Sequence, residues 1–136
     1  TAIRVEKEIS GHIANRLQAA LLREAMHLVA EGVGSVEDVD QAIAKGPGLR
    51  WAMMGPIMTF NLGGGRGGLE RYLEQFTPVF NDWFQELGQV TIDQPLRDKL
   101  VAGVKDEMGP RSMEELERWR DETFLKVLEA VASKEA

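Results

Sequence analysis

Apolar residues recur along the chain with a helical period, and the longest such stretch runs from Gly11 to about Gly32. Its apolar positions lie three or four residues apart and therefore share one face of a helix; they are Ala14, Leu17, Leu21, Ala25 and Leu28. Asn15 interrupts the apolar arc, although a buried amide without a partner costs roughly 1–3 kcal/mol. We therefore expect Asn15 either to bond backbone at the helix start or to meet another polar group.

The same periodicity predicts six or seven helices in all, with no internal repeat. The later segments are 36–45, 56–62, 69–76, 78–87, 96–108 and a last helix from 113 that frays at 134–136. Ser35 and Ser112 predict the helix starts, because each is followed three residues later by a carboxylate that completes a capping box. Pro47 with Gly48 predicts a loop, Pro78 predicts the start of a new segment, and residues 88–95 read as a linker.

Gly63, Gly65 and Gly68 match the G-x-G-x-x-G pattern of dinucleotide-binding turns. Such a turn needs a strand before it and a βαβ unit around it, whereas the preceding residues read as helix. We interpret this segment as a flexible connection between helices, and the aromatic stripe that follows it as core or subunit contact.

Residues 2–9 alternate apolar and polar side chains, which is typical of a strand. A single strand at the edge of a helical chain has nothing to pair with. We interpret it as the last strand, or the linker, of a sheet upstream of Thr1; a frayed terminus is the alternative.

The composition bounds the possible functions. The 136 residues suit one domain, and the net charge of −6 without a basic run argues against a nucleic-acid partner. The absence of cysteine excludes disulfides and thiolate chemistry and fits a reducing compartment, so we expect a cytoplasmic protein. No apolar run approaches the roughly 18–20 residues that cross a bilayer, and we expect no membrane partner.

Few residues are candidates for chemistry. His12 and His27 lack metal-ligand spacing, so we predict no metal site and interpret both as solvated or capping side chains. Arg50 follows a Pro-Gly loop beside Trp51, and a guanidinium suits a carboxylate or phosphate; an ordinary surface arginine with Trp51 packed beside it is equally consistent. The chain by itself lacks a complete active site.

Several motifs resemble the C-terminal helical domain of the 3-hydroxyacyl-CoA dehydrogenase family. They are Gly-x-Ile-x-Asn-Arg-Leu at 11–17, Glu-Gly-Val-Gly-Ser-Val-Glu-Asp-Val-Asp at 31–40, Gly-Leu-Arg-Trp-Ala at 48–52, Met-Gly-Pro at 54–56 and Trp-Arg-Asp at 119–121. The last three are similar to the branch that contains lambda-crystallin, an L-gulonate 3-dehydrogenase, and carnitine dehydrogenase. The resemblance implies an all-α bundle like the C-terminal domain of 6-phosphogluconate dehydrogenase, covering residues 11–136, with residues 1–10 left from a missing Rossmann domain.

The resemblance also implies a function. The family oxidises a 3-hydroxy substrate to its 3-oxo product by hydride transfer to NAD, and it places the NAD site, a His–Glu pair and a Ser in the upstream domain. This domain contributes one motif residue, which the match puts at Asn15, facing the cleft between domains. Arg50 and Trp51 are the implied substrate contacts. We expect a homodimer, and we expect the chain alone to be inactive.

The substrate stays open at this point. The family name favours an acyl-CoA and fatty acid metabolism, and the branch motifs favour a small hydroxy acid such as gulonate or carnitine. A free-standing helical interaction module without catalysis is the alternative of another class.

Overall fold

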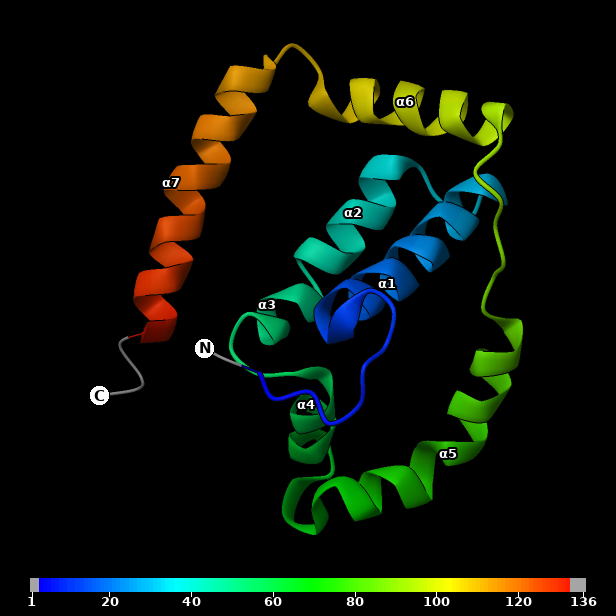
Figure 1. The fold of residues 1–136 in the computed structure, drawn as a ribbon, viewed down its shortest axis with the longest axis vertical. Helices are drawn as coiled ribbons and strands as arrows, with labels where there is room; N and C mark the ends of the chain where they lie inside the picture. Colours follow the sequence, from blue (N-terminus) through cyan, green and yellow to red (C-terminus); the bar gives the residue numbers. More distant parts are fainter. Residues whose placement is uncertain (1–2, 133–136) are drawn as a thin grey trace.

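The computed structural model describes residues 3–132, which form seven α-helices and one short 3-10 helix (Figure 1). The α-helices are α1 (His12–Ala30), α2 (Val36–Ala44), α3 (Pro47–Trp51), α4 (Pro56–Gly63), α5 (Gly68–Glu86), α6 (Gln94–Met108) and α7 (Met113–Ala132); the 3-10 helix η1 is Gly65–Gly67. No strand occurs within residues 3–132, so the predicted all-α class is confirmed.

Local capping signals place the helix starts where the sequence predicts them. The Asp38 backbone N–H donates to Ser35 Oγ at 3.1 Å, and the Asp38 carboxylate accepts from the Ser35 backbone N–H at 3.0 Å. Ser112 and Glu115 exchange the same two bonds at the start of α7. Both predicted capping boxes are therefore present.

Two proline predictions are wrong. Pro47 does not sit in a loop but begins α3, because the first helical position needs no backbone N–H. Pro78 does not start a new segment but lies inside α5, which continues through it and bends (Figure 1). The expected flexible connection at 63–68 is also shorter than predicted, since η1 and the start of α5 occupy most of it.

The segment before α1 pairs with no strand within residues 3–132. Residues 3–9 carry no sheet pairing, and Ile3, Val5 and Ile9 are exposed. The pairing predicted for these residues is with a sheet upstream of Thr1, so the strand interpretation stays a prediction. The linker interpretation stays a prediction, and Thr1 and Ala2 lie outside the described residues.

Close packing is confined to two places. The second half of α1 packs with α2 and α6 around Val29, Val36 and Leu96, the three buried apolar residues of the described chain. Separately, α4 and α5 form a hairpin in which Phe60 stacks on Tyr72 with ring centroids 5.0 Å apart. No helix packs extensively against α7.

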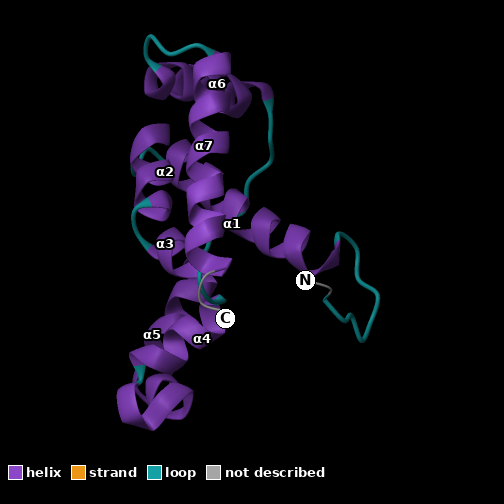
Figure 2. Cartoon of the chain, turned by 90° about the vertical axis from the view of Figure 1, so that its left-hand side faces the viewer, coloured by secondary structure: helices purple, strands orange, loops and turns teal. Residues whose placement is uncertain are grey.

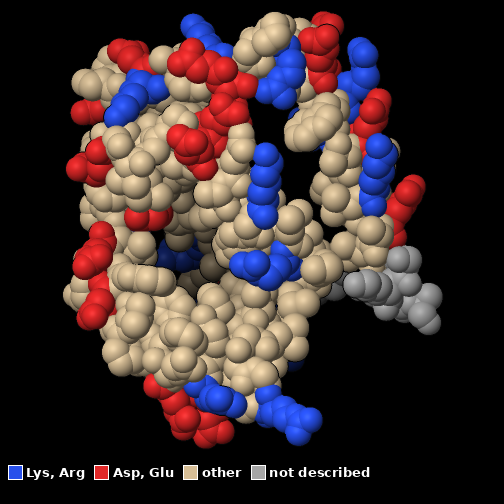
Figure 3. Space-filling model, turned by 180° about the vertical axis from the view of Figure 1, so that it is seen from behind, with Lys and Arg blue, Asp and Glu red and all other residues tan. Residues whose placement is uncertain are grey.

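The chain exposes far more surface than its mass requires. Its accessible surface is 11280 Å², whereas a compact monomer of 15.1 kDa exposes roughly 7100 Å². About 4200 Å² is therefore in excess of a compact fold. Seen from behind, openings separate α7 from the rest of the molecule (Figure 3).

Candidate functional site

Asn15 lies in the first turns of α1, just after a sharp change of chain direction. Gly11 and His12 have positive φ angles of 79° and 53°, and the His12 N–H bonds the Ile9 carbonyl at 3.3 Å. Positive φ is uncommon outside glycine, although histidine tolerates it better than most residues. The turn lies just before α1, and the first half of α1 projects away from the other helices, as Figure 2 shows from the side.

The Asn15 side chain is exposed and has no hydrogen-bond partner among the described residues. The predicted apolar arc around it is also uncovered: Ile13 and Leu17 are exposed, Leu17 by 59%. The expectation that Asn15 bonds backbone at the helix start is wrong. The amide and its apolar neighbours are exposed on the first turns of α1, and we call this uncovered surface the α1 face: Ile13, Asn15 and Leu17.

Arg50 and Trp51 lie at the end of α3, and their helix is short but braced. The backbone N–H groups of Met53 and Met54 both donate to the Arg50 carbonyl at 3.0 Å. The Arg50 side chain is exposed and forms no ion pair among residues 3–132. Trp51 is 38% exposed. The guanidinium is therefore available to an anion in solution or from another part of the protein.

The chain does not bring these three residues together. No hydrogen bond joins Asn15 to Arg50 or Trp51, and Figure 2 shows α3 in the slab of helices while the start of α1 projects from it. Within the described chain these residues therefore form no single site.

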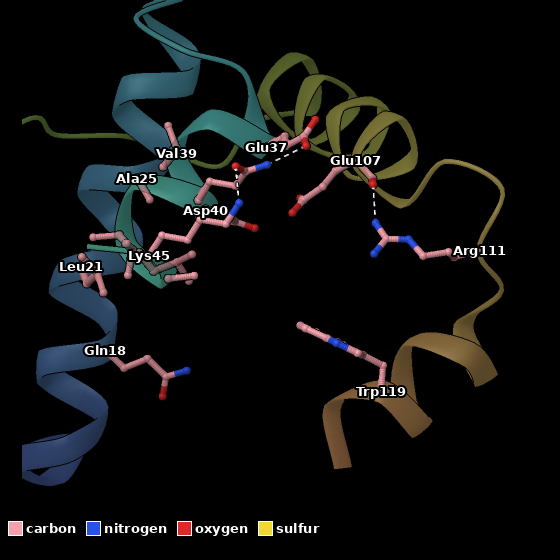
Figure 4. Close-up of a pocket in the computed structure, with 14 residues that line it drawn as sticks. Gln18, Leu21, Ala25, Glu37, Val39, Asp40, Lys45, Glu107, Arg111 and Trp119 are labelled. Atoms are coloured by element: carbon pink, nitrogen blue, oxygen red, sulfur yellow. Dashed lines mark hydrogen bonds between the residues drawn. The ribbon is translucent and has the colours of Figure 1, made fainter. Parts of the chain in front are cut away.

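A large cavity lies elsewhere, between α1, α2, the end of α6 and α7. It measures about 690 Å³ and opens to solvent. Figure 4 shows Trp119 of α7 pointing across it toward Gln18 and Glu107, and the wall on α1 and α2 is largely apolar. Burial, followed by the nearby carboxylates of Asp40 and Glu37, raises the pKa of Glu107 above its ordinary value.

Sequence reasoning missed this acidic grouping. Glu37 and Asp40 are three residues apart on α2 and share a face, which is readable from spacing. Glu107 joins them only because α6 packs on α2, and no local signal announces that contact. The charge of Arg111 acts in the opposite direction and lowers the pKa of Glu107, while its guanidinium donates to the backbone carbonyls of Met108 and Glu107.

The histidines form no metal site, and no group of three possible metal ligands occurs within residues 3–132. His27 is not the solvated or capping residue we expected: it is half-buried, with Gly88 packed against its ring. One turn before it, Glu24 accepts the Gly88 backbone N–H at 2.8 Å and so ties α1 to the α5–α6 connection. Within the described chain, no helix is long and apolar enough to cross a membrane.

The described residues do not fit a dinucleotide. The glycine-rich segment at 63–68 follows α4 and leads through η1 into α5, without the preceding strand that a phosphate-binding turn requires. Asn61 shapes it instead, because its side-chain oxygen accepts the Leu69 backbone N–H at 2.9 Å.

Comparison with known proteins identifies the family that the chain resembles. Residues 11–106 match the family model of the 3-hydroxyacyl-CoA dehydrogenase C-terminal domain. The chain is 44% identical over 127 residues to L-carnitine dehydrogenase of Oceanobacillus iheyensis, which covers 93% of this chain and 41% of that protein. It is 44% identical over 130 residues to the Streptomyces coelicolor L-carnitine dehydrogenase (96% and 41%) and 42% identical over 134 residues to that of Burkholderia mallei (98% and 42%).

The chain therefore belongs to the 3-hydroxyacyl-CoA dehydrogenase family, an oxidoreductase family, and corresponds to its C-terminal domain. It spans about two fifths of the length of the curated relatives it matches.

Proposed function

We propose that the chain is the C-terminal part of a dehydrogenase that oxidises a small 3-hydroxy acid to its 3-oxo product, with NAD as the acceptor bound by an upstream domain. The observation that carries the proposal is the match of nearly the whole chain to less than half of each L-carnitine dehydrogenase. The uncovered α1 face supports it, because that face begins next to the chain start, where an upstream domain would attach.

In this proposal Asn15 supports catalysis rather than performing it. A neutral amide cannot act as a general base at neutral pH, but it both donates and accepts hydrogen bonds. Placed against an upstream domain, Asn15 would orient the catalytic groups or the substrate hydroxyl. The apolar residues of the α1 face would exclude water and so strengthen that hydrogen bond.

Charge decides among the substrate classes. The chain carries a net charge of −6 and no basic run, which suits a coenzyme A phosphate poorly. A hydroxy acid needs one cation for its carboxylate, and the exposed, unpaired Arg50 provides one. The neighbouring Trp51 would add a cation–π contact if the acid carries a quaternary ammonium, as carnitine does. We therefore favour a carnitine-like substrate over an acyl-CoA.

We further propose that the chain pairs with a second copy of itself. Only three apolar residues are buried in the described chain, while large apolar side chains are exposed on most helices. Exposed apolar surface of this extent marks an interaction surface.

The test is a substrate panel on the enzyme expressed from the complete reading frame. L-carnitine, D-carnitine, L-gulonate and 3-hydroxybutyryl-CoA are each offered with NAD, and NADH formation is followed by absorbance. We expect the highest kcat/KM with L-carnitine. Preference for the acyl-CoA would overturn the substrate proposal, and no oxidation of any 3-hydroxy compound would overturn the dehydrogenase proposal. A reading frame that opens just before Thr1 would favour an interaction module.

A further inference from the structure

The helix α7 packs extensively against no other helix of the described chain. It has 20 residues and so extends about 30 Å, yet none of its residues is buried. Its apolar face includes Phe124 and Leu128, and Trp119 flanks it; all three are exposed, Trp119 by 63%. An amphipathic helix whose apolar face contacts nothing gains no packing stability from its own chain.

The connection from α6 holds α7 in this outward position. Arg111 caps the end of α6 by donating to the Glu107 and Met108 carbonyls at 2.6 and 2.9 Å. Ser112 and Glu115 immediately cap the start of α7. Only Gly109 and Pro110 lie between the end of α6 and the capping residue Arg111, and Gly109 takes a positive φ of 58°. The connection is therefore held by hydrogen bonds on both sides and sets the direction of α7.

The excess accessible surface of the chain, compared with typical interface sizes, indicates what covers α7. The chain exposes about 4200 Å² more than a compact fold of its mass. Contact with an upstream domain accounts for about 600–1500 Å² at most, which leaves about 2700 Å² or more exposed. An obligate pair of copies buries about 1000–2500 Å² or more on each partner, so a large interface of this kind covers most of the remainder.

The position of α7 agrees with a division of the exposed surface between an upstream domain and a second copy. An upstream domain would attach at the start of α1, which projects from one side of the molecule (Figure 2), whereas α7 stands across the cavity from the α1–α2 wall (Figures 1 and 4). That wall presents Leu21, Leu22, Val39 and Ile43 to the space in front of Trp119.

We infer that α7 is an exchanged arm: its apolar face lies on a second copy of this chain, and part of that copy fills the space between α7 and the α1–α2 wall. The inference rests on the proposed pairing and goes beyond it by naming the element that crosses between subunits. A twofold pair makes the exchange reciprocal, so each copy completes the core of the other.

A crosslinking experiment separates this arrangement from an arm that folds back on its own chain. The 136-residue chain with Phe124 replaced by the photo-crosslinker p-benzoylphenylalanine is unfolded, mixed with an excess of ¹⁵N-labelled unmodified chain, and refolded together. Irradiation then bonds residue 124 covalently to its neighbour, and mass spectrometry shows whether the crosslinked peptide carries ¹⁵N. We expect mostly labelled peptides from a second copy.

Three results are distinguishable. Labelled peptides support the exchanged arm. Unlabelled peptides alone, from a sample that light scattering shows to be a dimer, overturn the arm while leaving the pairing intact. A monomeric mass at all concentrations overturns the pairing and the arm together.

A matched pair of variants gives the energetic test. Phe124→Glu with Leu128→Glu places charge on the apolar face of α7, and we expect the dimer Kd to rise about 100-fold or more, as for the loss of two anchor residues. Glu122→Lys with Glu129→Lys alters charge on the other side of the same helix and should change Kd less than about tenfold. Equal Kd values for the two variants would overturn the inference.

Discussion

Asn15 has no role that the chain alone explains. Its side chain is exposed and unpartnered, on a helix half that the other helices leave uncovered. We predict that Asn15→Ala in the complete enzyme lowers kcat about 10-fold or more, the scale of a lost transition-state hydrogen bond, without changing Tm. Steady-state kinetics with thermal melting measure both. The control is Asn81→Ala on α5, an amide truncation far from α1 in the chain; unchanged turnover in Asn15→Ala would remove Asn15 from the site.

Arg50 is predicted to bind the substrate carboxylate. Arg50→Ala should raise KM by about 10-fold or more while kcat falls less, because a contact made equally in the ground and transition states acts on KM. Arg50→Lys should restore part of the affinity, since it keeps the charge but loses the bidentate fork. Arg66→Ala, an exposed arginine on η1, is the control. An Arg50→Ala enzyme with normal KM for the acid would show that Arg50 is an ordinary surface residue.

Gly103 illustrates a residue whose role no sequence pattern revealed. It lies inside α6, where glycine is unfavourable, and a Cβ added there would overlap the buried Val36 of α2, with the two Cβ atoms 2.9 Å apart. We predict that Gly103→Ala destabilises the protein by about 1–2 kcal/mol, because overpacking outweighs the gain in helix propensity. Denaturant unfolding measures it.

A double-mutant cycle provides the control for Gly103. In a Val36→Ala background, the added methyl at position 103 meets less side chain, so Gly103→Ala should become neutral or stabilising. Equal destabilisation in both backgrounds would place the cost in α6 itself and not in its contact with α2.

The helices differ in how far local sequence determines them. Serine with a carboxylate three residues later predicted the starts of α2 and α7 correctly, since the cap is complete within four residues. Proline was ambiguous, because it suits both a loop and a first helical turn; Pro56 was assigned correctly to a helix start and Pro47 was not. The cap that Asn61 places on α5 spans eight residues and two helices, so it is visible only in the fold.

The contact of α2 with α6 brings three carboxyl groups together, and this has a pH consequence. Burial and the carboxylates of Asp40 and Glu37 raise the folded-state pKa of Glu107. A raised folded-state pKa means that the fold is favoured while Glu107 is protonated and loses that stability as the pH rises through the folded pKa.

We therefore predict that Glu107→Gln raises Tm at pH 7 and has no effect below about pH 4, where the carboxyl is protonated in both states. The group is mostly solvated, so screening limits the gain to about 2 °C. Melting curves at fixed protein concentration across this range measure it. In an Asp40→Asn background the gain should shrink; a gain of the same size at every pH would assign it to packing instead of charge.

At the scale of the whole molecule, the apolar stripes were predictable and their partners were not. Periodicity predicted α1 and α7 as helices, and both are present; it also marked their apolar stripes and that of α5. It does not report what covers them, and in the described chain most of those residues are exposed. The candidate site shares this property: Asn15, Arg50 and Trp51 were identifiable as residues, but their separation follows from helix packing, which no local pattern reports.

A chain with three buried apolar residues gains too little from its own core to offset the entropy of folding. If a second copy supplies the rest, folding and pairing are one equilibrium, and Tm must rise with concentration. A tenfold increase shifts a dimer by about 1.4 kcal/mol, which is about 2–3 °C for a pair of this size. Calorimetry of the 136-residue chain over a hundredfold concentration range measures the slope. A Tm independent of concentration, with a monomeric mass by light scattering, would mean that the chain closes on itself, and its accessible surface in solution would then be near that of a compact monomer.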